Sequence, residues 1–324
     1  MSDALSTTVA RLFAAHCTPA VLRAAEDGHW PDALWHACTE AGLHLALIDR
    51  GDHSLDVSAS EAFGVARAAG AHAAPIPLVE TMLANWLLAH CDREPRSEPT
   101  VIADAGLRRV PWGQRAGVIM CGSKLSVFEP NELATARAGT NLAKEPRDDL
   151  TRSTPSREPF ARPDGVTDLR LRAAAAALRV AQMAGALESI AAMTIEYTTQ
   201  RVQFGKPIAK FQAVQQSAAI LAEQAAAAGA AADMAAEAFA NGIDVNAIAA
   251  AKTFAGEAAS IGAGLAHQLH GAIGFSREYA LHHRTQRLWS WRDEYGNDTE
   301  WAALLGSHLA RAGGDRLWTE ITAL

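Results

Sequence analysis

Apolar residues recur at two different spacings along this chain, and the change of spacing divides it into three parts. In residues 5–13, leucine, valine and phenylalanine are spaced as on one face of a helix. Pro31 stands where a first helical turn tolerates proline, and an apolar run follows it as far as Gly42. Apolar segments rich in alanine predict further helices over residues 59–69 and 78–88.

The middle of the chain has short apolar runs of a strand-forming kind. Residues 100–104, 116–121 and 124–130 are separated by Gly, Pro and Asn, which predicts a small sheet. Residues 144–165 contain four prolines and many charges among few apolar positions. This composition predicts an exposed linker or loop.

From residue 167 onward the pattern is helical again. Thr167 or Asp168 can cap the first helix of this part, and Asn241-Gly242 forms a suitable end for the second. The abundant alanine lets helices approach closely, so a bundle is expected, whereas a coiled coil would need sustained Leu or Ile at its core positions. The predicted helices cover residues 167–197, 213–240, 244–270, 278–289 and 300–311.

These patterns predict a mainly α protein with a small β domain. We expect an N-terminal helical domain over residues 1–92 and a small β domain with a proline-rich linker over residues 93–165. The C-terminal domain, residues 166–324, is expected to be a four-helix bundle.

Composition narrows the possible functions. The net charge of −7 argues against binding to nucleic acid, which usually needs a clustered basic patch. Every long apolar run is interrupted by polar residues or glycine, and the first residues show no signal-peptide pattern, so we expect a cytoplasmic protein that does not enter a membrane. The cysteines form no metal-binding motif and are expected to be reduced thiols; they are Cys17, Cys38, Cys91 and Cys121.

The stretch from Tyr197 to Gln212, YTTQRVQFGKPIAKFQ, concentrates groups that can hold an anion and an aromatic ring. Arg201 offers a planar set of donors, and Gln203 and Gln212 offer amides. Phe204 offers a flat apolar face. Arginine pairs with phosphate through two hydrogen bonds and keeps its charge, so this loop is suited to a pyrophosphate.

The same stretch resembles the loop with which acyl-CoA dehydrogenases grip FAD bound mainly to a neighbouring subunit, R-x-x-F-G-x-x-[I]-x-x-F-Q. A second segment, HQLHGAIGFSREY, is similar to the family turn Q-x-x-G-G-x-G-[FY]-x-x-E-[YF], whose backbone approaches the adenosine and pyrophosphate of FAD. Gln268 and Gly271 match this turn, while Ala272 replaces its second glycine. The flanking His267 and His270 can either donate to phosphate or simply be exposed.

The order of helical domain, small sheet and helical bundle is also that of the acyl-CoA dehydrogenase family. The resemblance implies α,β-desaturation of an acyl-CoA thioester: a carboxylate removes the α-proton and FAD accepts the β-hydrogen as hydride. The usual family position of that carboxylate, 27 residues after Gln268, holds Tyr295. An alternative family position, 26 residues before Arg201, holds Ala175. Glu294, one residue from the usual position, is the remaining candidate base.

The middle domain is also incomplete compared with this family. It lacks a T-E-P-x-A-G-S-D-type segment that covers the flavin ring in relatives. The chain thus lacks both the catalytic base and the segment that contacts the flavin ring. In this it is similar to the base-lacking subunit of heterotetrameric (α2β2) bacterial acyl-CoA dehydrogenases. Some of these enzymes act on CoA esters of sterol side chains. The resemblance then implies an unlike partner subunit, an acyl-CoA substrate and electron-transfer flavoprotein as the acceptor.

The sequence is also compatible with three other hypotheses about the function. The chain can be a homo-oligomeric dehydrogenase that uses Glu294 as its base. It can be a structural paralogue that has lost flavin, or a flavin monooxygenase on the same fold.

Overall fold

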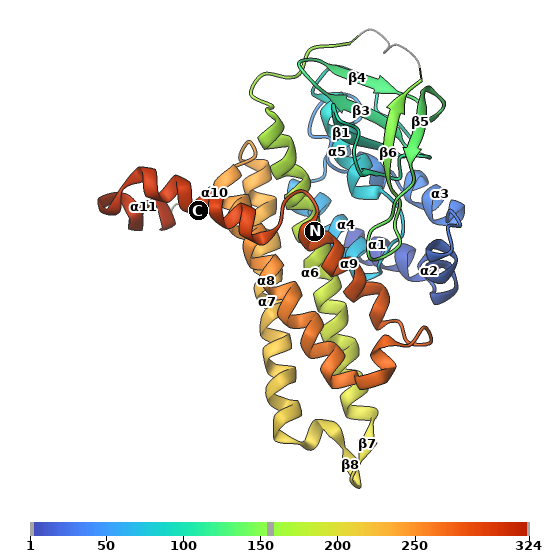
Figure 1. Ribbon diagram of the computed structural model, residues 1–324, viewed down its shortest axis with the longest axis vertical. Coiled ribbons are helices and arrows are strands. Elements are labelled where there is room, and N and C mark those ends of the chain that lie inside the picture. Colours follow the sequence, from blue (N-terminus) through green and yellow to red (C-terminus); the bar gives the residue numbers. More distant parts are fainter. Residues whose placement is uncertain (1–2, 154–158, 323–324) are drawn as a thin grey trace. The chain divides into compact units, whose positions relative to one another are not determined.

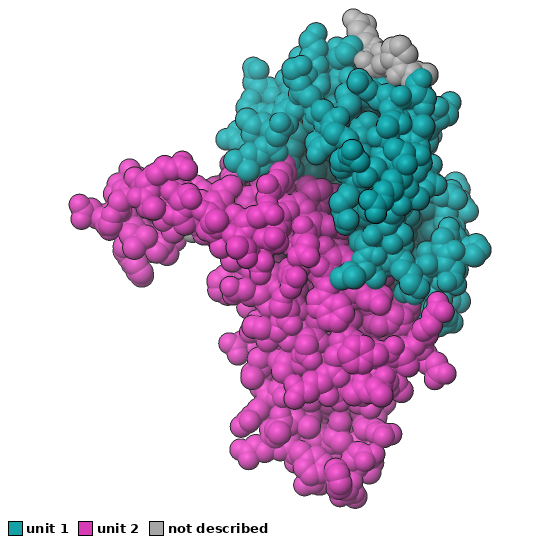
Figure 2. Space-filling view, viewed as in Figure 1, with its two compact units in different colours: residues 1–65, 74–171 teal, residues 66–73, 172–324 magenta. Residues whose placement is uncertain are grey.

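Helices open and close the chain, and the residues between them form small sheets (Figure 1). The computed structural model describes residues 3–153 and 159–322. The chain divides into two compact units, coloured separately in Figure 2. Unit 1 comprises residues 1–65 and 74–171, and unit 2 comprises residues 66–73 and 172–324. The division rests on compactness, so the predicted domain boundaries at residues 92 and 165 stay predictions.

Unit 1 begins with helices whose apolar faces the periodicity identified. Helix α2 was not predicted; it begins at Pro19, directly after Thr18, whose Oγ1 accepts a hydrogen bond from the backbone N–H of Val21 at 3.4 Å. Almost every side chain of α5 is buried, including the polar Glu80, Thr81 and Asn85 among its apolar residues. The bounds are α1 Asp3–His16, α2 Pro19–Glu26, α3 Asp32–Glu40, η1 Leu43–Leu45, α4 Ala59–Ala71 and α5 Leu78–Ala89.

The sheet region of unit 1 contains two three-stranded sheets among the described residues. In the first, β1 (Thr100–Asp104) runs parallel to β3 (Gly117–Cys121), which pairs antiparallel with β4 (Leu125–Phe128). The second sheet has the order β2-β6-β5 and is antiparallel throughout. Its strands are β2 Val110–Pro111, β5 Leu133–Arg137 and β6 Arg147–Arg152.

Strand β6 corrects the predicted linker over residues 144–165. Arg147, Asp148 and Leu150 are buried, and Leu150 belongs to the apolar core of the sheet region. Charged residues hid this strand, because Arg147 is buried through an ion pair with Glu145 at 3.1 Å rather than exposed to water. The part of the predicted linker at residues 154–158 lies outside the described residues.

Unit 2 is a bundle of long helices, which confirms the predicted mainly α fold with a small β part. The hairpin strands β7 Val202–Gln203 and β8 Lys206–Pro207 and the turn η3 Ile208–Lys210 connect the first two helices, and η4 Gly271–Phe275 follows the third. The short turn η5 Gly314–Arg316 precedes a last helix that was not predicted. The helices are α6 Asp168–Gln200, α7 Gln212–Ala240, α8 Val245–His270, α9 Leu281–Asp293, α10 Asp298–Ala312 and α11 Leu317–Thr322.

Two glycines let the end of α4 pack directly on α6 within unit 2. A Cβ added at Gly70 would collide with the backbone oxygen of Gln182, and one added at Gly185 would collide with the backbone oxygen of Arg67. Beside this crossing, the Arg67 guanidinium pairs with the Glu188 carboxylate. The helix backbones are therefore in contact, and α6 has no room there for a side chain.

We predict that Gly185→Ala lowers the free energy of unfolding by about 2 kcal/mol or more, because the methyl group must push α4 and α6 apart. Gly264 provides a matched control, since it lies in α8 with open space where a Cβ would stand. Gly264→Ala should raise the free energy of unfolding by about 0.5–1 kcal/mol through the higher helix propensity of alanine. Urea denaturation of both variants measures the effects, and equal stabilities would contradict the close crossing.

Candidate functional site

The predicted anion-binding loop folds as a β-hairpin between α6 and α7, at one end of the bundle (Figure 1). Val202 pairs with Pro207, and Gln203 pairs with Lys206. Phe204 and Gly205 form the two-residue turn and both have positive φ, 52° and 78°. Two successive positive φ angles are typical of the type I′ turn, whose twist matches that of the flanking strands.

Phe204 is an unusual residue for its place in this turn. Type I′ turns prefer Asn, Asp or Gly, because a larger side chain is strained at positive φ by about 1 kcal/mol or more. The turn nevertheless presents an aromatic ring that is 91% exposed in the chain alone. Strain and an exposed apolar ring at one residue are a combination that occurs at binding sites.

The polar groups of the loop also point into solvent. Arg201, Gln203 and Gln212 are all exposed. The backbone that carries Arg201 is fixed, because its N–H donates to Tyr197 O and its carbonyl accepts from Ile208 N–H, each at 2.8 Å. The hairpin and the start of α7 therefore expose a guanidinium and two amides, with the backbone of Arg201 held in place, which fits the recognition of a phosphate.

The second predicted segment is a tight turn at the end of α8. Gly271 has φ 64° and ψ −144°, a conformation that favours glycine. Gly274 is closely packed, since an added Cβ would lie 3.1 Å from both His270 Cβ and Leu281 Cδ2. Gln268, Gly271 and Ala272 are exposed, so the turn presents its side-chain amide and backbone to solvent.

Tyr197 brings the two segments together within unit 2. It stands one helical turn before Arg201, and its ring stacks on His270 with the centroids 4.4 Å apart. Its hydroxyl group donates to the backbone oxygen of His270 at 3.3 Å. Tyr279 completes this aromatic contact, 6.0 Å from the ring of Tyr197. The end of α6 is thus attached to the turn after α8, and both predicted segments lie at one end of the bundle.

The histidines of the turn are not exposed, which corrects one of the two alternatives predicted for them. His267 and His270 are both buried, and burial lowers the pKa of each. His270 Nδ1 lies 2.8 Å from Ala266 O and its Nε2 lies 3.3 Å from the Tyr279 hydroxyl group, so both ring nitrogens are occupied.

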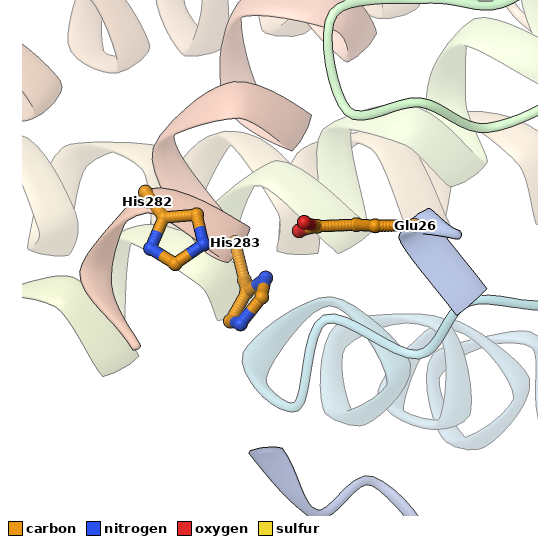
Figure 3. A group of neighbouring side chains, drawn as sticks. All are labelled: Glu26, His282 and His283. Carbon is orange, nitrogen blue, oxygen red and sulfur yellow. The ribbon is translucent and has the colours of Figure 1, made fainter. Parts of the chain in front are cut away.

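At the start of α9, the rings of His282 and His283 lie 3.9 Å apart (Figure 3).

The candidate base, Glu294, is engaged in an ion pair. Its Oε2 accepts from Arg179 Nε at 3.0 Å and lies 2.8 Å from Arg179 Nη2. Arg179, on α6, is buried, and its guanidinium also lies over the rings of Trp291 and Tyr295. The Glu294 carboxylate therefore has a fixed structural partner in Arg179.

The two family positions for the base carry no carboxylate, and the structure shows what surrounds them. Ala175 is buried on α6, one helical turn before Arg179. Tyr295 adopts a positive φ of 59°, and its carbonyl accepts hydrogen bonds from Arg172 Nε at 3.0 Å and Trp301 Nε1 at 3.1 Å. The segment after α9 is thus fixed by arginine and tryptophan side chains.

A fully buried lysine completes this network. Lys252 Nζ on α8 donates to the carbonyls of Trp291 at 2.9 Å and Arg292 at 2.7 Å, and so caps the end of α9. Burial lowers the pKa of Lys252 to about 7, partly opposed by the nearby Glu294 carboxylate. Sequence reasoning missed Arg179 and Lys252, because each is a single polar residue in an alanine-rich helix, a pattern that also fits an exposed side chain.

The described residues contain no helix that is both long and apolar enough to cross a membrane.

Comparison with known proteins identifies relatives of both the sequence and the fold. Residues 170–292 match the family model described as acyl-CoA dehydrogenase, C-terminal domain. The chain is 29% identical over 294 residues to acyl-CoA dehydrogenase IpdE2 of Mycobacterium tuberculosis, a match that covers 86% of this chain and 87% of IpdE2. It is also 29% identical over 292 residues to IpdE2 of Mycolicibacterium smegmatis, covering 86% of this chain and 89% of that relative.

Solved structures share the whole architecture. A steroid acyl-CoA dehydrogenase, the Tcur3481–Tcur3483 G363A variant, superposes with a TM-score of 0.85 at 18% identity, covering 95% of this chain and 97% of that chain. The ChsE4–ChsE5 complex from Mycobacterium tuberculosis gives 0.79 at 22% identity, covering 94% and 96%. These likenesses show the fold, which is that of the acyl-CoA dehydrogenases.

The buried Lys252 predicts a specific dependence of stability on pH. Below pH 7 both the folded and the unfolded chain bind the lysine proton, and the folded chain bears the full cost of burying the charge. Between about pH 7 and pH 10 only the unfolded chain keeps the proton, so stability rises with pH relative to a chain without this group.

We predict that the wild-type protein gains up to about 1.4 kcal/mol per pH unit over the variant Lys252→Met between pH 7 and pH 9. Denaturant unfolding of both proteins at pH 6, 7, 8 and 9 measures the difference. Parallel stability curves would show that Lys252 keeps its proton throughout.

Proposed function

We propose that the chain is the non-catalytic subunit of a heteromeric, FAD-dependent acyl-CoA dehydrogenase. Residues 170–292 of this chain match the C-terminal domain of the acyl-CoA dehydrogenases. The observation that carries the proposal is a contrast within unit 2. The groups suited to FAD, at Arg201 and Phe204, are exposed, whereas the candidate base Glu294 is held by Arg179. The chain offers contacts to a cofactor but no available carboxylate at either family base position.

In this proposal, the hairpin binds the part of FAD that extends from a partner subunit. Arg201 pairs with the pyrophosphate, and the amides of Gln203 and Gln212 donate beside it. Phe204 packs its exposed ring against the cofactor, which removes apolar surface from water. Gln268, Gly271 and Ala272 approach the adenosine side. When bound, FAD supplies the acceptor for the hydride, while these residues hold and orient it.

The partner that we propose is an unlike acyl-CoA dehydrogenase chain that carries the catalytic carboxylate. The ChsE4–ChsE5 structure, which contains a chain of this fold, is a complex of two differently named proteins. The Tcur3481–Tcur3483 structure is that of a steroid acyl-CoA dehydrogenase. We therefore propose a bulky, steroid-derived acyl-CoA as the substrate class, with electron-transfer flavoprotein as the acceptor and the cytoplasm as the location.

One specific observation favours a second candidate function, that of a structural subunit without flavin. Ala272 stands where the family turn has a glycine, and its Cβ occupies space that a closely approaching ligand would need. A flavin-free structural subunit would tolerate this methyl group without loss. Its exposure leaves room for a shifted cofactor, so we give precedence to the FAD-binding role.

We predict that Arg201→Ala in the assembled complex weakens FAD binding by about tenfold or more, because a charge-assisted hydrogen bond to the pyrophosphate is lost. Flavin absorbance per complex and titration of the apoprotein with FAD measure the effect. Lys210→Ala removes an exposed positive charge close to the hairpin and is the matched control, which should leave FAD content unchanged. Equal FAD content in all three proteins would favour the flavin-free alternative.

We predict that Glu294→Gln in the complex lowers turnover by less than about tenfold, because the partner supplies the base. Removal of a true general base costs about 10²–10⁴-fold. Turnover under saturating acyl-CoA and the rate of flavin reduction distinguish the two cases. A loss in the larger range with FAD retained would identify Glu294 as the base and this chain as a catalytic subunit.

A further inference from the structure

Unit 1 contains a cavity that the proposed flavin site does not use. Its volume is about 930 Å³, which lies in the range of pockets for small organic molecules. Its walls come from the end of α2 and the loop to α3, from the turn after β2, and from the loop before β6. All of the residues that line it belong to unit 1.

The feature that points to a ligand is Asp148 on β6. Its side chain is on the same face of the strand as Leu150, which is part of the apolar core, and Asp148 is only 1% exposed. Its Oδ1 accepts from Gln114 Nε2 at 3.2 Å and from Gly139 N–H at 3.4 Å. Its Oδ2 is buried and has no hydrogen-bond partner among the described residues.

A buried carboxylate oxygen without a partner is costly, because burial removes its water and, within residues 3–153 and 159–322, no group replaces it. The two bonds to Oδ1 fix the carboxylate in one orientation, with Asp148 forming part of the cavity wall. The missing partner is therefore a hydrogen-bond donor, and a donor that carries positive charge compensates the carboxylate most fully.

Two tryptophans contribute aromatic rings to the wall of the cavity. The rings of Trp30 and Trp112 are nearly perpendicular, at 76°, with their centroids 5.4 Å apart. Both line the cavity. The Arg115 guanidinium lies over the Trp30 ring, 5.3 Å from its centroid, so this ring already attracts a cation. Aromatic faces beside a carboxylate are the arrangement by which proteins recognise organic ammonium groups.

The charges of the lining agree with this chemistry. Glu26 (Figure 3), Asp27 and Asp148 are acidic, while Arg115 and Lys144 are basic. The Lys144 amine lies 3.8 Å from the Glu26 carboxylate, so these two charges offset each other. Arg115 is exposed and can move aside. Three lining residues are acidic and two are basic, so the formal charge of the lining favours a cation over an anion.

We propose that this cavity binds an organic amine in its ammonium form, with Asp148 Oδ2 accepting an N–H and with Trp30 and Trp112 packing against the hydrocarbon body. This site is independent of the flavin hairpin, which lies in unit 2. The proposal gives unit 1 a small-molecule ligand, and it does not depend on whether the chain has a partner subunit.

Calorimetric titration of the full chain with phenethylamine tests the proposal, with 2-phenylethanol as the neutral probe of the same shape. The amine should bind about tenfold more tightly than the alcohol, because only the amine makes a charge-assisted hydrogen bond. Asp148→Asn should remove this preference. Asp52→Asn, which neutralises an exposed aspartate outside the cavity, should leave it unchanged.

A third variant keeps the test decisive if Asp148→Asn does not fold. Arg115→Ala removes an exposed side chain and should tighten phenethylamine binding several-fold, because the competing cation leaves the Trp30 ring. Equal affinity for amine and alcohol, absence of amine binding, or unchanged binding in Arg115→Ala would each overturn the proposal.

Discussion

Close packing along α6 is the constraint on which the rest of unit 2 depends. From Ala173 to Leu187 this helix is buried almost all round, and alanine and glycine occupy most positions. Such a helix has little side-chain volume of its own, so its neighbours come close to its backbone, as at Gly185. The few long polar residues that remain on it, Arg179 and Gln182, are buried and must find partners inside the protein.

This constraint explains why Glu294, the candidate base, is held in an ion pair. A buried arginine at residue 179 requires a counter-charge, and Glu294 supplies it from the end of α9. Lys252 donates to the carbonyls that precede the same segment. The segment around Glu294 thus connects α6, α8 and α9. The exposed hairpin lies elsewhere in unit 2, and the ring of its strained phenylalanine, Phe204, lies 6.0 Å from the ring of Phe211.

The sequence predicted elements that depend on local pattern and missed features that depend on distant pairing. Helical periodicity located α6 to α8 to within a few residues, because long apolar faces repeat many times. The ion pair between Arg179 and Glu294 joins residues 115 positions apart, and no local signal identifies it. Strand β6 was hidden because its buried residues include Arg147 and Asp148. The motif around Arg201 could be recognised in the sequence, whereas the positive φ of Phe204 is known only from the structure of the hairpin.

The central claim is that this chain contacts FAD without being able to house it alone. The most direct measurement is the flavin content of the chain purified by itself and after co-expression with an unlike acyl-CoA dehydrogenase chain that carries the base. We expect the chain to be colourless alone and to copurify with the partner as a complex that contains FAD and desaturates acyl-CoA. A chain that is yellow by itself, with stoichiometric FAD and full turnover, would contradict it.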